Sequence, residues 1–281
     1  MYPDRVANAG FHVIAHRGGA GYAPENTLAA FEHAQQLGFR EVELDVRLSR
    51  DGELVLFHDE RLDAKTPLAG PVGGHDATEL LEADIGRWFD ATHPEVVQRY
   101  AGTTLATLGQ LLDRFGASFD YHVELKGTQL ELPGRVLAAL RERGAGCRAV
   151  VTSFSFDDLV RVVELDAAAS PCLLLRDPRG WLSSLPARRR EQYVESQCER
   201  VDRAALAGFA MVGVRACALS RELVDHARSR GLKTRAWGLE SDAEMEHVLA
   251  VGANGATIDW PLVLLDRLRA RGIEPAAGGL E

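Results

Sequence analysis

Short apolar runs alternate with segments of helical periodicity along most of this 281-residue chain, and this alternation constrains the fold more than any other feature. It is typical of βα units that build a mainly parallel sheet. An α/β barrel commonly uses about 250 residues, so a single barrel fits the length. The predicted strands are Phe11–His16, Glu41–Val46, Leu54–His58, Tyr121–Lys126, Ala149–Phe154, Cys172–Arg176, Met211–Arg215, Thr234–Leu239 and Gly255–Asp259.

One connection breaks the alternation. The runs Glu41–Val46 and Leu54–His58 are joined only by Arg47–Glu53, which is too short for a parallel crossover. Asp51-Gly52 in this connection is a turn signal, so the two runs are predicted to form a hairpin. The predicted strands therefore fit a barrel of eight with one irregular strand.

Three other segments depart from the βα pattern. The stretch from about residue 61 to 104 is rich in proline and glycine and is too long for an ordinary loop. We expect it to be an inserted cap over the barrel mouth, within a single domain that covers residues 1–281. Pro178–Arg203 is polar and is predicted to be a solvated helical excursion, and Glu274–Glu281 to be a frayed tail.

The charge balance limits the partners. A net charge of −9 argues against a general nucleic-acid or anionic-membrane surface, which needs a basic field. An anionic substrate would need local compensation from a metal, an arginine or a lysine. No run approaches the ~18 apolar residues of a transmembrane segment, and no apolar signal region precedes residue 11, so we expect a cytoplasmic protein.

Acidic side chains lie on two predicted strands. Glu43 and Asp45 are two residues apart, so they point to the same face of their strand. Two carboxylates facing a barrel interior repel each other unless a cation joins them, and all-oxygen ligation suits Mg²⁺ or Ca²⁺. Glu124 could be a third metal ligand, and Lys126 could reach a phosphate oxygen. The alternative is a buried ion-pair network without a metal, and the spacing alone does not decide between the two.

Two histidines end predicted strands. His16 and His58 would lie at the C-terminal mouth of a barrel, where such enzymes place their chemistry. A histidine pair suits phosphodiester cleavage, because one can take a proton from the nucleophile while the other protonates the leaving alkoxide. Arg17 offers a fork of donors to phosphate oxygens. Asn26 or Thr27 would cap the first helix, and Glu25 or Asn26 could also brace His16 or the metal.

A tryptophan near the other end of the chain is a further candidate. Trp237 lies in a strand run and could line the barrel mouth as a wall for an apolar or glyceryl group. A tryptophan packed in the core is an equally good interpretation.

These residues together resemble the glycerophosphodiester phosphodiesterase family. The matching elements occur in the family's order along most of the chain: His16-Arg-Gly18, Pro24-Glu-Asn-Thr27, Glu43-Leu-Asp45, Asp51-Gly52, His58-Asp59, Glu124-Leu-Lys126, Ser153-Phe154, Trp237 and Thr257-Ile-Asp259-Trp-Pro261. Any one of them could occur by chance, but the ordered set is specific.

The resemblance implies a distorted TIM (β/α)8 barrel with a small inserted cap segment. It also implies one divalent cation, Mg²⁺ or Ca²⁺ with Mn²⁺ as an alternative, on Glu43, Asp45 and Glu124. The roles that it implies for the other residues are acid–base catalysis by His16 and His58 and substrate binding by Arg17, Lys126 and Trp237. The implied reaction cleaves a small glycerophosphodiester to sn-glycerol 3-phosphate and an alcohol, with a glycerol hydroxyl as a hypothetical internal nucleophile that would give a cyclic phosphate.

The chain departs from the family pattern at two places near the mouth. Arg61-Leu-Asp-Ala-Lys-Thr66 stands where the family often has Arg-Thr-Thr, and Gly238-Leu-Glu240 where it often has Thr-Val-Asn. These departures concern substrate choice more than core chemistry. The alternatives are a lysophospholipase D-type or other phosphodiesterase, an inactive phosphodiester-binding barrel, and a metal enzyme that stabilises an enolate, which paired histidines fit less well.

Overall fold

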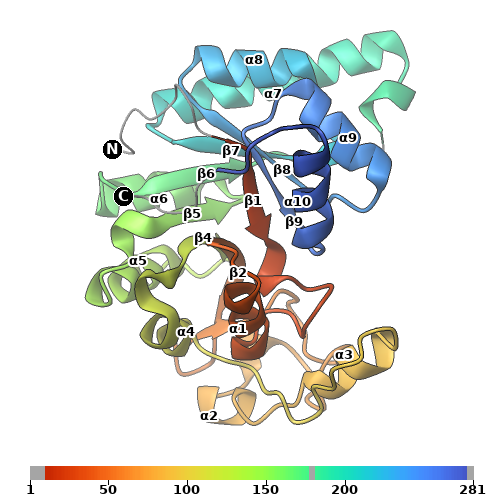
Figure 1. Ribbon diagram of the computed structural model, residues 1–281. Helices are drawn as coiled ribbons and strands as arrows, with labels where there is room; N and C mark the ends of the chain where they lie inside the picture. Colours follow the sequence, from red (N-terminus) through yellow and green to blue (C-terminus); the bar gives the residue numbers. More distant parts are fainter. Residues whose placement is uncertain (1–9, 177–180, 277–281) are drawn as a thin grey trace. The chain divides into compact units, whose positions relative to one another are not determined.

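The computed structural model describes residues 10–176 and 181–276, which form two compact units. The N-terminal unit contains Ala15–Ala149, and the C-terminal unit contains the described residues up to Ile14 and from Val150 on. Strands and helices alternate along the C-terminal unit, whereas the N-terminal unit also contains two successive strands and three successive α-helices (Figure 1). All nine predicted strands are confirmed, with ends that differ by up to two residues.

The N-terminal unit is built around a three-strand pairing. β2 (Glu41–Leu48) pairs in parallel with β4 (Asp120–Leu125) and antiparallel with β3 (Leu54–Leu56). The predicted hairpin is thereby confirmed, and Gly52 takes the positive φ of 84° that its turn requires. The helices of this unit are α1 (Leu28–Gln36), α2 (Ala77–Leu80), α3 (Gly86–Thr92), α4 (Leu108–Phe115) and α5 (Leu132–Glu142).

Both faces of β2 are buried, which sets up the site. Val42, Leu44 and Val46 are fully buried on one face. Glu43 and Asp45 alternate with them and are also buried, with 2% and 0% of their surfaces exposed. The register places Asp45 opposite Glu124 on β4. A parallel strand buried on both faces normally carries apolar residues throughout, so the two acids mark a functional exception.

The segment from residue 61 to 104 packs on its own apolar cluster. That cluster joins the end of β3 to the segment through Val55, Phe57, Leu62, Val72, Leu80, Ala83, Ile85 and Leu105. A second cluster brings Phe89 of α3 against Ala30 of α1, with Trp88 partly buried beside it. The segment is therefore a packed part of the N-terminal unit, and its role as a cap remains a prediction.

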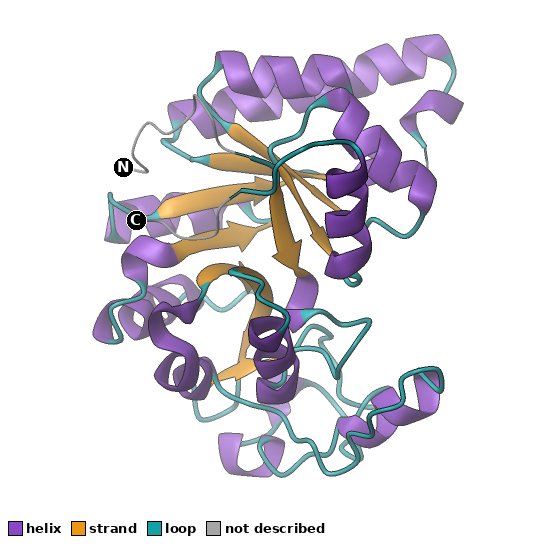
Figure 2. Ribbon diagram, viewed as in Figure 1, coloured by secondary structure: helices purple, strands orange, loops and turns teal. Residues whose placement is uncertain are grey.

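The C-terminal unit repeats strand–helix pairs. Its strands β5 to β9 pair in parallel with their sequence neighbours, and helices lie along the outside of these strands (Figure 2). The strands are β1 (His12–Ala15, whose last residue belongs to the N-terminal unit), β5 (Ala149–Ser153, whose first residue belongs to the N-terminal unit), β6 (Ser170–Leu174), β7 (Met211–Arg215), β8 (Lys233–Trp237) and β9 (Gly255–Ile258). The helices are α6 (Phe156–Leu165), α7 (Ala187–Leu206), α8 (Arg221–Ser229), α9 (Asp242–Val251) and α10 (Pro261–Ala270).

Serine and threonine side chains fix where several helices begin. Each accepts a hydrogen bond from the backbone N–H three residues later, which satisfies one of the open donors of the first turn. These N-caps are Thr27, Thr107, Ser155, Ser220 and Ser241. Thr27, one of the two expected caps, therefore starts α1.

The polar excursion after β6 is confirmed where it can be seen. α7 covers most of it, while residues 178–180 of the predicted excursion lie outside the described residues. The prediction of a frayed tail is wrong for residues 274–276, because the backbone there forms a parallel bridge with Phe11 through hydrogen bonds of 3.0 and 2.9 Å. Residues 277–281 of that tail lie outside the described residues. Among the described helices, none is both long and apolar enough to cross a membrane.

Candidate active site

The backbone turns sharply directly after β1. His16–Gly18 forms a single 3₁₀ turn, and Arg17 within it has a φ of 52°, a left-handed conformation that is uncommon outside glycine. This turn aims the Arg17 backbone N–H at Glu43, whose Oε2 accepts it at 3.1 Å. Nε2 of His16 lies 3.8 Å from the same oxygen. Strained backbone that is held by such contacts is typical of functional sites.

Three carboxylates converge on the buried face of β2 and β4. Glu43, Asp45 and Glu124 each offer an oxygen, and these oxygens lie within 4.8 Å of one another. Oδ1 of Asp45 is buried and accepts no hydrogen bond from the described residues; the Lys126 ammonium lies 3.4 Å away, so this oxygen keeps lone pairs for a further ligand. Oxygen donors at this spacing fit a hard divalent cation. The three predicted ligands are therefore brought together.

The pKa values of the two acids on β2 are shifted in opposite directions. Burial raises the pKa of Glu43 to about 7, and the nearby Asp45 charge adds to the shift. Burial would also raise the pKa of Asp45, but the Arg17 and Lys126 cations outweigh it and hold that pKa well below its usual range. Two carboxylates that are close and buried cannot both ionise cheaply without additional positive charge. A cation at this position would supply that charge.

Two basic side chains flank the carboxylates, and their predicted role in binding phosphate remains a prediction. Arg17 places Nε 3.1 Å from Oδ2 of Asp45, and Lys126 places Nζ 2.6 Å from Oε1 of Glu124 and 3.4 Å from Oδ1 of Asp45. Burial would lower the pKa of Lys126, but Asp45 and Glu124 raise it above its ordinary value, so the ammonium stays charged. The ion pairs that were considered as an alternative to a metal are present, and they coexist with the open carboxylate cluster.

Asn26 braces one carboxylate. Its Nδ2 donates to Oδ2 of Asp45 at 2.9 Å, and its Oδ1 accepts the Asp45 backbone N–H at 3.1 Å. Asn26 is fully buried and has a φ of 58°, a conformation that asparagine tolerates better than most residues. Asn26 therefore braces Asp45, and its expected role in bracing the metal or His16 remains a prediction.

His58 lies just beyond the end of β3 and is oriented at two points. Its Nδ1 is 2.7 Å from Oδ1 of Asp59, and its backbone carbonyl accepts two hydrogen bonds from Arg47, at 3.0 and 2.7 Å. Burial lowers the pKa of His58 below its ordinary value despite the opposing charge of Asp45. If Nδ1 donates to Asp59, Nε2 is left to exchange a proton with substrate. This arrangement suits a general acid–base group near neutral pH.

Trp237 belongs to the C-terminal unit, whereas the residues above belong to the N-terminal unit. It ends β8, with its ring at an edge-on angle 5.8 Å from that of Phe154 and with the Arg215 guanidinium 5.8 Å from its centre. Its buried Nε1 makes no hydrogen bond within the described part of the chain. Its predicted role as a substrate wall remains a prediction.

Nothing in the sequence indicates Lys65, a residue that contacts the neighbours of Arg17 and His58. Lys65 extends from the 61–104 segment and pairs with both Glu25 and Asp59, at 2.8 and 2.9 Å. No periodicity or spacing signalled it, because its position depends on the path of an irregular segment. The acid that follows His58 directly was a detectable signal for Asp59 as the orienting partner.

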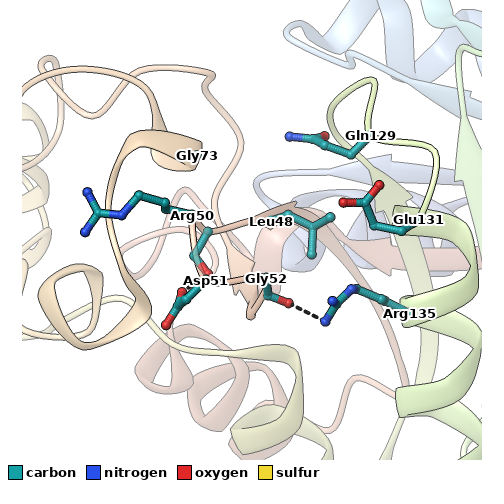
Figure 3. A pocket seen from close by; sticks show the side chains of 9 residues that line it. Leu48, Arg50, Asp51, Gly52, Gly73, Gln129, Glu131 and Arg135 are labelled. Atoms are coloured by element: carbon teal, nitrogen blue, oxygen red, sulfur yellow. Dashed lines mark hydrogen bonds between the residues drawn. The ribbon is translucent and has the colours of Figure 1, made fainter.

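A cavity of about 320 Å³ also lies in the N-terminal unit, and none of the predicted site residues lines it (Figure 3). The Arg135 guanidinium extends towards the Asp51-Gly52 turn and donates to the Gly52 carbonyl at 2.9 Å. Arg50, on the opposite wall, is engaged by Asp76 and the Gly74 carbonyl. The guanidinium groups that line this cavity thus already donate hydrogen bonds within the protein.

Comparison with known proteins places this geometry in a family. The model of the glycerophosphoryl diester phosphodiesterase family matches residues 16–263. A glycerophosphodiester phosphodiesterase of Bacillus subtilis (strain 168) is 29% identical over 270 residues, covering 93% of this chain and 86% of that protein. One from Caldanaerobacter subterraneus subsp. tengcongensis is 30% identical over 268 residues, covering 92% and 98%.

A solved structure agrees with the fold. An Oleispira antarctica phosphodiesterase in complex with the product sn-glycerol-3-phosphate is 24% identical, with a TM-score of 0.75 over 92% of this chain and 97% of that one. The fold is thus the predicted α/β barrel of the TIM type, formed by parallel strands with flanking helices. The chain belongs to the glycerophosphoryl diester phosphodiesterase family and is an enzyme.

Proposed function

We propose that this enzyme uses a divalent cation and a histidine pair to hydrolyse glycerophosphodiesters to sn-glycerol 3-phosphate and an alcohol. The observation that supports this most is the convergence of three buried carboxylates, within 4.8 Å, beside a histidine, an arginine and a lysine. Acids alone would repel a phosphodiester, so the arrangement suits this substrate class only with added positive charge.

Glu43, Asp45 and Glu124 would hold the cation. Their oxygen-only donor set favours Mg²⁺ or Ca²⁺, with Mn²⁺ as an alternative, and the open Oδ1 of Asp45 fits this use. When bound, such an ion polarises a phosphoryl oxygen and offsets the charge that develops during displacement.

Arg17 and Lys126 would bind the phosphate. Both are held in place by the carboxylates, and each has further donors that can turn towards an anion. Their charges persist at neutral pH, because Asp45 raises the pKa of both above the ordinary value even though burial opposes it. We infer that they fix the orientation of the diester, with Trp237 as a proposed wall for its organic part.

His16 and His58 would move the protons. One takes the proton of the attacking hydroxyl, and the other protonates the alkoxide that leaves. His58 is oriented for this by Asp59, and its lowered pKa leaves the ring neutral at pH 7. Where the attacking hydroxyl belongs to the glycerol, a cyclic phosphate precedes the final hydrolysis.

The test is a panel of glycerophosphodiesters and lysophospholipids, assayed with Mg²⁺, Mn²⁺ and Ca²⁺ and analysed for products. We expect release of sn-glycerol 3-phosphate from glycerophosphodiesters, loss of activity with chelator, and a drop of about 10²- to 10⁴-fold in H16A and H58A. H75Q is the matched control, because His75 lies outside the site and contacts Glu79 and the Ala69 carbonyl. Full turnover by H16A or H58A would refute the histidine roles, and a strict preference for lysophospholipids would refute the substrate class.

A further inference from the structure

Lys65 is a largely shielded lysine between two acids that contact site residues. Its side chain is 13% exposed, and Nζ lies 2.8 Å from Oε1 of Glu25 and 2.9 Å from Oδ2 of Asp59. We propose that Lys65 is a positioning residue, which holds the side chains of His58 and Arg17 in the orientations that the reaction needs. This inference rests on the proposed function.

The contacts on either side of Lys65 lead to the reacting groups. On one side Glu25 accepts a hydrogen bond from Nη1 of Arg17 at 3.0 Å, and on the other Asp59 contacts Nδ1 of His58 at 2.7 Å. Lys65 therefore lies two contacts from each of the two side chains. A shift of about 1 Å in such groups can cost about 10²-fold in rate, so the ammonium controls geometry that matters for turnover.

The surroundings hold the ammonium in one place. Besides the two acids, Nζ lies 5.0 Å from the centre of the Trp88 ring, within the range of a cation–π contact. Trp88 is on α3, so the lysine also links the site to a helix of the 61–104 segment. Because Lys65 has three partners and is mostly shielded from water, its side chain is more restricted than that of a lysine in a surface ion pair. A surface ion pair contributes little to stability.

Removal of the ammonium would affect both acids. Glu25 has 8% of its side chain exposed, so it would keep Arg17 as its remaining cationic partner in a poorly solvated place. Asp59 is one-third exposed and could turn to water, which would release the His58 ring from its present tautomer and orientation. A residue that only anchored the 61–104 segment would lower stability without changing the properties of His58.

The test compares K65M, D59N and the double variant K65M/D59N with wild type and H58A, using glycerophosphocholine and Mn²⁺. We expect K65M to lower kcat by about 10- to 100-fold. We also expect the acid limb of its kcat/KM profile to move to higher pH, because the Asp59 charge beside His58 is no longer offset. The double variant should be within about twofold of the slower single variant, since both changes remove the same restraint.

The matched control is R61M. Arg61 lies in the same segment, but its side chain is exposed and pairs with Asp63, so kcat should not change. Circular dichroism at the assay temperature verifies folding, and K65Q replaces K65M if the methionine variant does not fold.

Two results would overturn the positioning role while leaving the proposed function intact. The first is wild-type kcat and an unshifted acid limb in K65M while H58A is inactive. The second is a double variant whose fold-loss in kcat equals the product of the fold-losses of K65M and D59N. An inactive wild type, or an H58A variant with full activity, would instead refute the proposed function.

Discussion

Asn26 offers a quantitative test of how the site is built. In N26A, Oδ2 of Asp45 loses a charge-assisted donor and the Asp45 backbone N–H loses its acceptor, both in buried surroundings. Each loss costs about 1–3 kcal/mol. Alanine must also adopt the φ of 58°, which costs about 1–2 kcal/mol. We therefore expect the free energy of unfolding to fall by about 3–8 kcal/mol.

N26G separates the two causes. Glycine adopts a positive φ without strain, so this variant keeps the hydrogen-bond loss and relieves most of the backbone term. It should be more stable than N26A by about 1 kcal/mol. Urea unfolding at pH 7, followed by far-UV circular dichroism and tryptophan fluorescence together, measures both values and reports whether the two compact units unfold in separate steps. An N26A variant within about 1 kcal/mol of wild type would refute the reasoning.

Three further predictions concern packing, pH and metal. In G86A the added Cβ would lie 1.7 Å from the Tyr100 carbonyl oxygen, so we expect a loss of about 3 kcal/mol in urea unfolding, and a neutral result would contradict this packing. Burial would raise the pKa of Asp59, but the hydrogen bond to His58 keeps that pKa below its ordinary value. Asp59 therefore adds stability to the folded state above pH 4, and this stability is lost as the pH falls further. The stability gap between wild type and D59N should accordingly narrow from pH 5 to pH 3, and a constant gap would count against the contact. Mn²⁺ at about 100 times its Kd should raise the stability of wild type by about 2.7 kcal/mol in thermal scans, and an equal rise in E124Q would argue against Glu124 as a ligand.

The barrel strands could be predicted because their physical cause is local. Alternating acids and aliphatics identify β2, and the short connection with Asp51-Gly52 leaves an antiparallel partner as the available geometry. Strand ends were less exact: His16 was expected on a strand but lies in the turn after β1, because Arg17 takes a left-handed conformation that no propensity indicates.

The carboxylate cluster was predictable for the same reason. Glu43 and Asp45 share a face by strand geometry, and parallel pairing of β2 with β4 brings Glu124 opposite Asp45. Lys65 was not predictable, since its contacts depend on how an irregular segment rich in proline and glycine folds back over residues that lie far away in sequence. Contacts of this kind are set by packing of the whole segment and leave no periodic pattern.

Anomalous diffraction from crystals grown with Mn²⁺ shows whether the three carboxylates form one cation site. We predict a single peak at about 2.0–2.6 Å from an oxygen of each of Glu43, Asp45 and Glu124. The peak should vanish in E43Q/E124Q crystals. A Mn²⁺ peak elsewhere, with these three carboxylates engaged only by Arg17 and Lys126, would contradict the account.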